Sequence, residues 1–216
     1  KTMGVVEWTL LVFLSVIWGG SVFFIKIILA ELPPLTIVLC RVSIGALVLL
    51  FAVRVSGNQM LSDQKTWGVF MFMGVINNLI PFSLISWGQT QISSSLASIL
   101  NATTPVWTVL LAHFLTADEK LTKSRFGGVI FGLIGVVIMI GWGDLFGFRI
   151  NVLAQLAVIG AAISYGFAGI YGKRFWDSPA IVTAAGQLTG TAIMAFPITM
   201  IVDQPWTYPI PGIHTW

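Results

Sequence analysis

Charged residues are scarce in this sequence: only 9% of its 216 residues are Asp, Glu, Lys or Arg, whereas 56% are hydrophobic. A soluble domain carries roughly 25% charged residues, which its water-facing surface requires. The low charge content therefore excludes a soluble enzyme, a nucleic-acid-binding module and a disordered tail. The formal net charge of +3 is small and falls in a few loops, so no nucleic-acid partner is expected.

Cysteine and histidine are also scarce, which limits the chemistry available to the chain. The single cysteine, Cys40, lies in an apolar run and has no partner for an internal disulfide. The two histidines are expected far apart, with His113 near the inner membrane surface and His214 in the external tail. A metal site needs several ligands close together, and an intramembrane serine protease needs a Ser and a His at the same depth. We therefore predict no metal, no cofactor and no enzymatic activity.

Long apolar runs, in contrast, fill most of the chain. A membrane-spanning helix takes about 20 apolar residues. Seven runs fit this length: Trp8–Leu29, Pro34–Val53, Thr66–Gly88, Ser94–Leu115, Arg125–Trp142, Asn151–Arg174 and Ser178–Val202. The first run is too long for a cleaved signal peptide, and a second span follows it closely. We predict an all-α polytopic membrane protein embedded in the lipid bilayer.

The eleven Lys and Arg residues divide unevenly between the two faces that these spans define. Eight lie on the side of the N-terminus and three on the opposite side. Because Lys and Arg accumulate in cytoplasmic loops, this distribution predicts a cytoplasmic N-terminus. The seventh span then ends outside.

A weak internal repeat links the two ends of the chain. The second copy begins 147 residues (165 minus 18) after the first, and five spans separate the two copies. An odd number of spans places them in opposite orientations, which is typical of the inverted repeats of secondary transporters. We predict a first repeat over residues 1–145, with spans one to five, and a second repeat beginning in residues 146–216, with spans six and seven. The matching residues are Trp18-Gly19, Lys26, Pro34 and Arg41 in the first copy, and Tyr165-Gly166, Lys173, Pro179 and Gln187 in the second.

Three stretches resemble the drug/metabolite transporter superfamily, specifically its EamA-type exporters. In order, they are Trp18-Gly19-Gly20-Ser21 with Pro33-Pro34 and Arg41, then Ser94–Leu100 with Pro105, then Glu119-Lys120-Leu121-Thr122 with the glycine-rich span Gly127–Gly135. Asp118 departs from the family pattern, which has Gly before the glutamate. The order and spacing of these elements carry the resemblance, since no single motif is specific.

This resemblance implies ten helices in two inverted five-helix halves. It also implies export of small metabolites such as amino acids by alternating access, across the inner (plasma) membrane of a bacterium. The chain shows only about seven spans. We expect the sequence to be cut short; the alternative is a shortened form that pairs with another chain. The oligomeric state is left open.

Polar residues inside spans are costly unless they face a cavity or a partner, so each is a candidate site. In span four, small polar residues and a proline share one helix face, namely Ser94, Ser98, Asn101, Pro105 and Thr108. They face either a substrate or a closely packed helix. Asn101 is the preferred substrate ligand because its amide offers donors and an acceptor. Pro105 predicts a kink near mid-membrane.

Two further pairs complete the candidate substrate-binding residues. Asn77 and Asn78 lie near the centre of span three, followed by Pro81, and bind either a substrate or a neighbouring helix. Trp18 and Tyr165 occupy matching mid-span positions in the two repeats. They form either a wall for an apolar or aromatic substrate or ordinary packing contacts.

Arg41 lies about 10 Å inside span two, which is deep for an unpaired guanidinium. It either attracts an anionic group at the external mouth or locks helices together through backbone carbonyls, and we favour the lock. Gln187 takes this position in the second copy. We group Arg41 and Gln187 with Pro81 and Pro105 as gating or structural residues.

A membrane transporter is therefore the leading hypothesis, with a small-molecule substrate and facilitated export, because no Asp or Glu lies deep in a predicted span. The alternative is a non-transporting scaffold or assembly subunit, since seven spans need not enclose a pathway. A retinal protein is excluded because Ser178–Val202 contains no lysine for a Schiff base. The sequence does not specify which metabolite is carried.

Overall fold

The structure, a computed structural model, describes residues 4–60, 63–117, 119–140, 150–175, 178–209 and 211–212. All regular structure in these residues is helical, which confirms the predicted all-α class. The α-helices are α1 (Val5–Ile28), α2 (Pro34–Val55), α3 (Gln64–Gly74), α4 (Ile80–Gln91), α5 (Ser94–Asn101), α6 (Thr104–Leu115), α7 (Lys123–Ile140), α8 (Ile150–Tyr171) and α9 (Ala180–Val202). A π-helix, η1 (Val75–Leu79), joins α3 to α4, and the short 3₁₀ helices η2 (Gly172–Phe175) and η3 (Pro205–Thr207) follow α8 and α9.

Six helical segments among the described residues are long and apolar enough to cross a membrane. They correspond to six of the seven predicted spans: Val5–Ile28, Pro34–Val55, Gln64–Gln91, Ser94–Leu115, Ile150–Tyr171 and Ala180–Val202. The remaining predicted span, Arg125–Trp142, corresponds to α7, an 18-residue helix about 27 Å long. Residues 141 and 142 lie outside the described residues, as does the predicted repeat boundary at 145.

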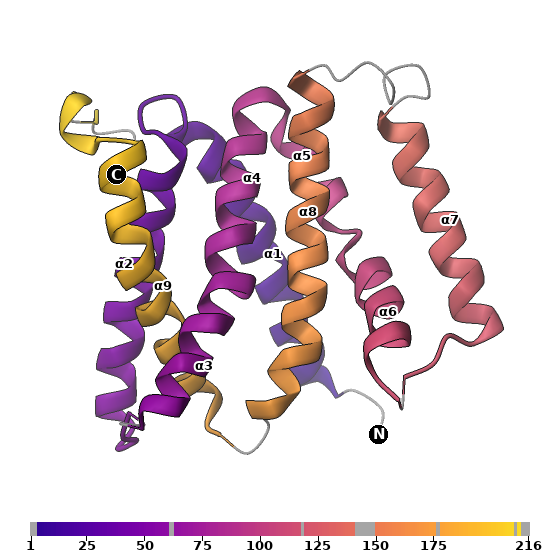
Figure 1. Ribbon diagram of the computed structural model, residues 1–216, viewed down its shortest axis with the longest axis horizontal. Helices are drawn as coiled ribbons and strands as arrows, with labels where there is room; N and C mark the ends of the chain where they lie inside the picture. The colour runs from indigo at the N-terminus through magenta and orange to yellow at the C-terminus, as the bar shows by residue number, and fades with distance from the viewer. Residues whose placement is uncertain are drawn as a thin grey trace.

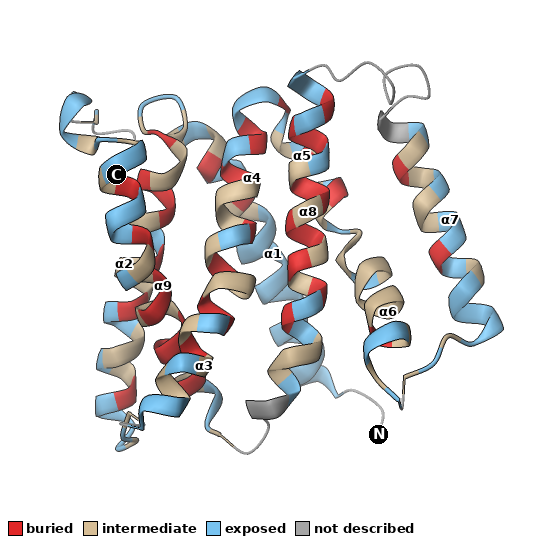
Figure 2. Cartoon of the chain, viewed as in Figure 1, coloured by how far each residue is buried: buried red, intermediate tan, exposed pale blue. Residues whose placement is uncertain are grey.

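Apolar side chains cover much of the outer surface of the bundle. α1 is the clearest case, because exposed residues line it almost from end to end (Figure 2). Phe13, for example, is 62% exposed. A water-soluble monomer rarely exposes contiguous apolar surface on this scale, so these faces suit lipid. The protein is an integral membrane protein.

The helices stand side by side, and sequence-distant helices are neighbours (Figure 1). α9 packs against α2 and α3, while α8 packs against α4, α5 and α6. α1 touches α4 and α5, and α7 packs against α6. The two last helices therefore lie among the helices of the first part of the chain.

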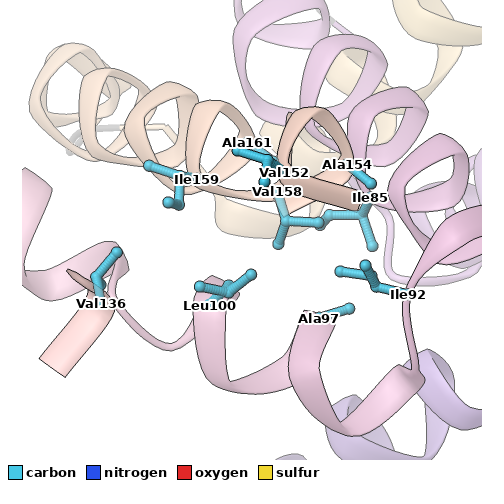
Figure 3. Close-up of a cluster of buried hydrophobic side chains, with 10 residues drawn as sticks. All are labelled: Ile85, Ile92, Ala97, Leu100, Val136, Val152, Ala154, Val158, Ile159 and Ala161. Carbon is cyan, nitrogen blue, oxygen red and sulfur yellow. The ribbon is translucent and has the colours of Figure 1, made fainter. Parts of the chain in front are cut away.

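The larger hydrophobic core cluster lies where α4, α5 and α7 meet α8 (Figure 3). Ile85, Leu100 and Val158 are among its buried side chains. α4 and α8 approach closely at Gly88, where an added Cβ would lie 3.0 Å from the Ala154 carbonyl oxygen. Small residues allow such close approach in membranes, where dispersion contacts between helices replace the hydrophobic effect. α4 and α8 both contribute lining residues to the site described below.

Side chains from distant helices satisfy the exposed backbone groups at helix ends. The Asp203 carboxylate, just after α9, accepts from the Thr36 backbone N–H at 2.7 Å and so caps the start of α2. Lys26 of α1 donates to the carbonyls of Gln89 and Ile92 at the end of α4, where a cation also suits the helix dipole. Lys26 thus binds a neighbouring helix end.

Candidate functional site

A cavity of about 240 Å³ lies between α1, α2, η1, α4, α5 and α8. It brings together six of the candidate residues identified from the sequence: Trp18, Arg41, Asn77, Asn78, Asn101 and Tyr165. A second cavity of about 840 Å³ adjoins it and adds Ser98 and Pro105. The two cavities share Trp18, Val22, Asn77, Asn101 and Tyr165. We call these five residues the central wall.

The predicted span three is not a continuous α-helix, because η1 interrupts it. The Ile80 N–H bonds to the Val75 carbonyl, five residues back. In this register Pro81 would pair with the Ile76 carbonyl, but proline has no N–H to donate. The Ser164 hydroxyl of α8 donates to that carbonyl instead, at 2.6 Å. Such π-bulges recur at functional sites, and this one carries both asparagines.

Asn77 and Asn78 face different surroundings although they are adjacent. The Asn77 side-chain N–H donates to Gln187 Oε1 of α9 at 3.1 Å, and Asn77 lines both cavities. Asn78 is buried, and its side-chain N–H donates to the Thr191 hydroxyl at 3.2 Å. Gln187 and Pro81 line neither cavity. Gln187 contacts Asn77 of the central wall, and Pro81 follows η1 in the chain. Asn77 is thus held at the cavity surface, whereas Asn78 mainly joins η1 to α9.

The predicted kink in span four is confirmed as a break between α5 and α6, just before Pro105. Proline cannot donate to the carbonyl four residues back, which belongs to Asn101. The Thr104 hydroxyl donates to that carbonyl at 2.7 Å, and the Thr103 hydroxyl donates to the Leu100 carbonyl at 2.6 Å. Local hydroxyls therefore satisfy the backbone, and the break turns the Asn101 end of α5 toward the cavities.

Asn101 carries an acceptor that no described residue satisfies. Its side-chain Oδ1 is buried and has no hydrogen-bond partner. Gln89 and Gln155 have similar unpaired oxygens, but neither lines either of the two cavities. A buried polar atom without a partner costs about 1–3 kcal/mol, so such atoms require a specific explanation. Asn101 lines both cavities, so a ligand that bonds to this oxygen is one such explanation.

Arg41 lines the smaller cavity with its guanidinium 4.2 Å from the centroid of the Phe82 ring. This is a cation–π contact, and it joins α2 to α4. Within the described part of the chain, Arg41 forms no hydrogen bond or ion pair. The backbone lock favoured from the sequence is therefore not the contact that it makes. Among the residues that the structure describes, no Asp or Glu lines either cavity, so Arg41 makes the smaller one positively charged.

At the face of the bundle where α6 and α8 end, Glu119 forms an ion pair with Lys173. The hydrogen bond and the charge of Lys173 lower the pKa of Glu119 below its ordinary value. This contact ties the segment before α7 to the end of α8. Asp118, the predicted departure from the family pattern, lies outside the described residues.

The family model described as "EamA-like transporter family" matches residues 7–141, which is more than half of the chain. The chain belongs to the EamA-like transporter family. This membership confirms the resemblance found in the sequence. The fold is therefore that of a family of membrane transporters.

Relatives of this EamA-like chain include three that are named as uncharacterized transporters. The chain is 24% identical to YoaV of Bacillus subtilis over 90% of its own length and 68% of that protein. It is 28% identical to YvbV of the same organism, over 76% of the chain and 53% of YvbV. It is 22% identical to the inner membrane transporter YedA of Escherichia coli, over 90% of the chain and 62% of YedA. The chain thus spans about half to two thirds of the length of these relatives.

A solved crystal structure shares the fold of the EamA-like chain. The TM-score is 0.59 at 20% sequence identity, and the match covers 89% of this chain and 69% of the other. At this identity the likeness concerns the fold alone. It supports the arrangement of helices in which the two cavities lie.

Sequence reasoning missed several residues that shape the cavities of this EamA-like chain. Phe82, which stacks on Arg41, and Ser164, which replaces the missing donor of Pro81, carry no sequence signal by themselves. Thr191 was detectable, because it follows Gln187 by four residues and therefore shares its helix face.

Proposed function

We propose that this protein exports small amphiphilic metabolites, amino acids among them, across the bacterial inner membrane. The observation that carries the proposal is the central wall, a set of amide and aromatic residues between two cavities inside a membrane-spanning bundle. A substrate moving from one cavity to the other passes Trp18, Asn77, Asn101 and Tyr165. The smaller cavity lies just below the roughly 300–1,000 Å³ typical of drug-sized ligands, which favours a small metabolite.

Alternating access between two inverted repeats is the mechanism that we propose. The repeats are residues 1–145 and the portion that begins in 146–216. Their matching residues Trp18 and Tyr165 come from α1 and α8, which run in opposite directions, and both line both cavities (Figure 1). The matching residues Arg41 and Gln187 also belong to one site. Arg41 lines the smaller cavity, and Gln187 accepts the hydrogen bond of Asn77, which lines the same cavity. This quasi-symmetric placement supports the repeat.

The side chains of the central wall then have distinct roles. The amides of Asn77 and Asn101 form hydrogen bonds with the polar end of the substrate, and Trp18 and Tyr165 contact its apolar part. Ser98 extends the polar surface into the larger cavity. Pro81 and Pro105 maintain the two helix irregularities that orient the amides. Since no carboxylate lines either cavity, we propose facilitated export without a proton-carrying acid in this part of the chain.

Flux from proteoliposomes tests this function. The purified protein is reconstituted, and the release of labelled L-leucine, L-phenylalanine and L-threonine is compared with protein-free vesicles. We expect protein-dependent flux of at least one amino acid. At equal protein content, this flux should fall at least about tenfold in Asn77→Ala and in Asn101→Ala, because each substitution removes a charge-assisted hydrogen bond to the substrate. Gln91→Ala, at an exposed polar position at the end of α4, is the control.

The opposite results have clear meanings. Absence of flux for all three amino acids from the intact protein contradicts amino-acid export and favours the alternative of a non-transporting scaffold or assembly subunit. Flux that is equal in the wild-type protein and both variants keeps the transporter but removes the central wall as its binding site.

A further inference from the structure

The lining of the smaller cavity includes one positively charged residue and one residue whose side-chain acceptor has no partner among the described residues. Arg41 supplies the charge, and Asn101 Oδ1 supplies the acceptor. Resting on the proposed transport function, we infer that the site recognises a zwitterion. Arg41 binds the carboxylate of the substrate, and Asn101 Oδ1 accepts a hydrogen bond from its ammonium group.

The Arg41 contact with Phe82 prepares the guanidinium for a carboxylate. The Arg41 Cζ lies 4.2 Å from the centroid of the Phe82 ring, and the N–H donors of arginine point outward in the plane of the guanidinium. The cation–π contact uses none of these donors in a hydrogen bond, so they remain for a ligand. A carboxylate matches these donors with two parallel hydrogen bonds, which a lysine ammonium cannot reproduce.

The cost of placing Arg41 here also points to an anionic ligand. An ionisable residue about 10 Å inside a span is expensive unless it has a partner or lines a water-filled cavity. In the described part of the chain no acidic side chain lines the cavity. The charge therefore has no acidic partner among the described residues, and a bound carboxylate compensates it. A purely cationic substrate would instead be repelled.

Asn101 completes the recognition of the second charge. Its Oδ1 is an acceptor, so it suits an ammonium group or another N–H donor. Because an amide carries no net charge, Asn101 binds the ammonium group of the substrate without forming an ion pair with Arg41. One cavity thus offers complementary partners for both ends of an α-amino acid head group, and the apolar lining residues Val22, Ile25 and Ile85 remain for its side chain.

Competition in counterflow tests the inference. Uptake of labelled L-leucine, or of L-phenylalanine if that is carried better, is competed with the unlabelled acid, its methyl ester, its decarboxylated amine and its deaminated acid. For the wild-type protein we expect the ester and the amine to compete about 10–100-fold more weakly than the amino acid, which is the loss expected for a charged hydrogen-bond pair. The deaminated acid should compete more weakly than the amino acid, by a smaller factor.

Variants assign the two ends of the substrate. Arg41→Gln should weaken the apparent affinity for the amino acid about 10–100-fold, to the level of its ester. The affinity of Arg41→Lys should lie between those of the wild type and Arg41→Gln. Asn101→Ala should remove the difference between the amino acid and its deaminated form. Arg54→Gln is the control, because it removes the same charge at an exposed position near the other end of α2, outside the cavity. The four compounds should compete in this variant as they do in the wild type.

The outcomes separate this inference from the proposed function. Amino-acid flux with equal competition by the ester, or with unchanged affinity in Arg41→Gln, overturns zwitterion recognition and leaves the transporter intact. The wild-type comparison of acid and ester decides the matter even if Arg41→Gln fails to fold. Absence of flux for every amino acid overturns both.

Discussion

Adjacent residues in the π-helix η1 have separable roles, because their partners differ. Asn78 donates to Thr191, which also lies 2.8 Å from the Gln187 carbonyl and 3.1 Å from the Gly74 carbonyl. We expect Asn78→Ala to lower the free energy of unfolding by about 0.6 kcal/mol and by no more than about 1.7 kcal/mol, the range for interhelical hydrogen bonds in membranes. Denaturation of the purified protein in detergent micelles measures this change.

The control for Asn78→Ala is Gln91→Ala, an exposed polar position at the end of α4, which should unfold nearly as the wild type does. Substrate affinity should also stay within about twofold in Asn78→Ala, since its amide points to α9. A large loss of affinity without loss of stability would instead place Asn78 in the binding surface.

The ion pair of Glu119 and Lys173 predicts a pH-dependent contribution to stability. Lys173 lowers the pKa of Glu119 in the folded protein. A carboxyl group whose pKa is lower when folded stabilises the protein at pH values above its unfolded pKa, about 4.3. That contribution disappears as the pH falls through the folded pKa. We therefore expect Glu119→Gln to unfold at a slightly lower temperature than the wild type at pH 7, and the two to converge in strong acid.

The effect should be small and sensitive to salt, because both side chains are exposed to solvent. Thermal unfolding at pH 7 with low salt and with 1 M salt checks this expectation. A difference between Glu119→Gln and the wild type that stays constant across pH and salt would show that the pair does not act through charge.

At the scale of helices, the π-bulge depends on Ser164, whose hydroxyl donates the hydrogen bond that Pro81 cannot donate. Ser164→Ala leaves the Ile76 carbonyl without its donor, and we expect this to cost about 1–3 kcal/mol of unfolding free energy. Pro81→Ala restores a backbone N–H that can bond to the same carbonyl. The cost of Ser164→Ala should therefore fall sharply in a Pro81→Ala background, which a double-mutant cycle of unfolding free energies measures.

The same element links structure to transport. With a backbone donor at position 81, η1 can also change to α-helical pairing, in which the Ile80 N–H bonds to the Ile76 carbonyl and the residue-81 N–H bonds to the Asn77 carbonyl. The Ile76 carbonyl then has a donor in either register, and loss of the bulge rotates Asn77 by about 100° relative to α4. Pro81→Ala should then reduce amino-acid flux at unchanged protein content. Additive costs in the cycle together with full flux in Pro81→Ala would show that the bulge does not require the proline.

The helical spans followed from composition, and the break before Pro105 followed from the missing N–H of proline. The location of η1 did not follow, although Pro81 was equally visible. A proline in a helix permits a kink, a break or a π-turn, and the choice depends on donors from other helices, here Ser164 and Thr191. In the same way, Arg41 lies within the helix that was predicted for it, but its contact with Phe82 depends on how α2 and α4 pack. Side-chain type and depth are local properties, whereas partners are tertiary ones.

At the scale of the whole molecule, the site lies between the two parts of the proposed repeat. α8, from the second part, packs against α4, α5 and α6 of the first, and α9 packs against α2 and α3. Tyr165 of α8 therefore completes a wall whose other members come from α1, η1 and α5. A movement of α8 and α9 relative to the other helices would change both cavities at once, as alternating access requires.

The direction of transport depends on the orientation of the bundle, and the charge distribution predicts it. The sequence predicts eight of the eleven Lys and Arg residues on the N-terminal side, so we expect that side in the cytoplasm. Single cysteines test this in a Cys40→Ser background: Lys120→Cys at the predicted cytoplasmic face and Gln91→Cys at the opposite one. In spheroplasts, a membrane-impermeant thiol reagent should label Gln91→Cys directly and Lys120→Cys only after permeabilisation. The reverse pattern would invert the bundle and place the Arg41 end of the smaller cavity nearer the cytoplasm, and a carboxylate site there would favour capture of substrate from the cell interior.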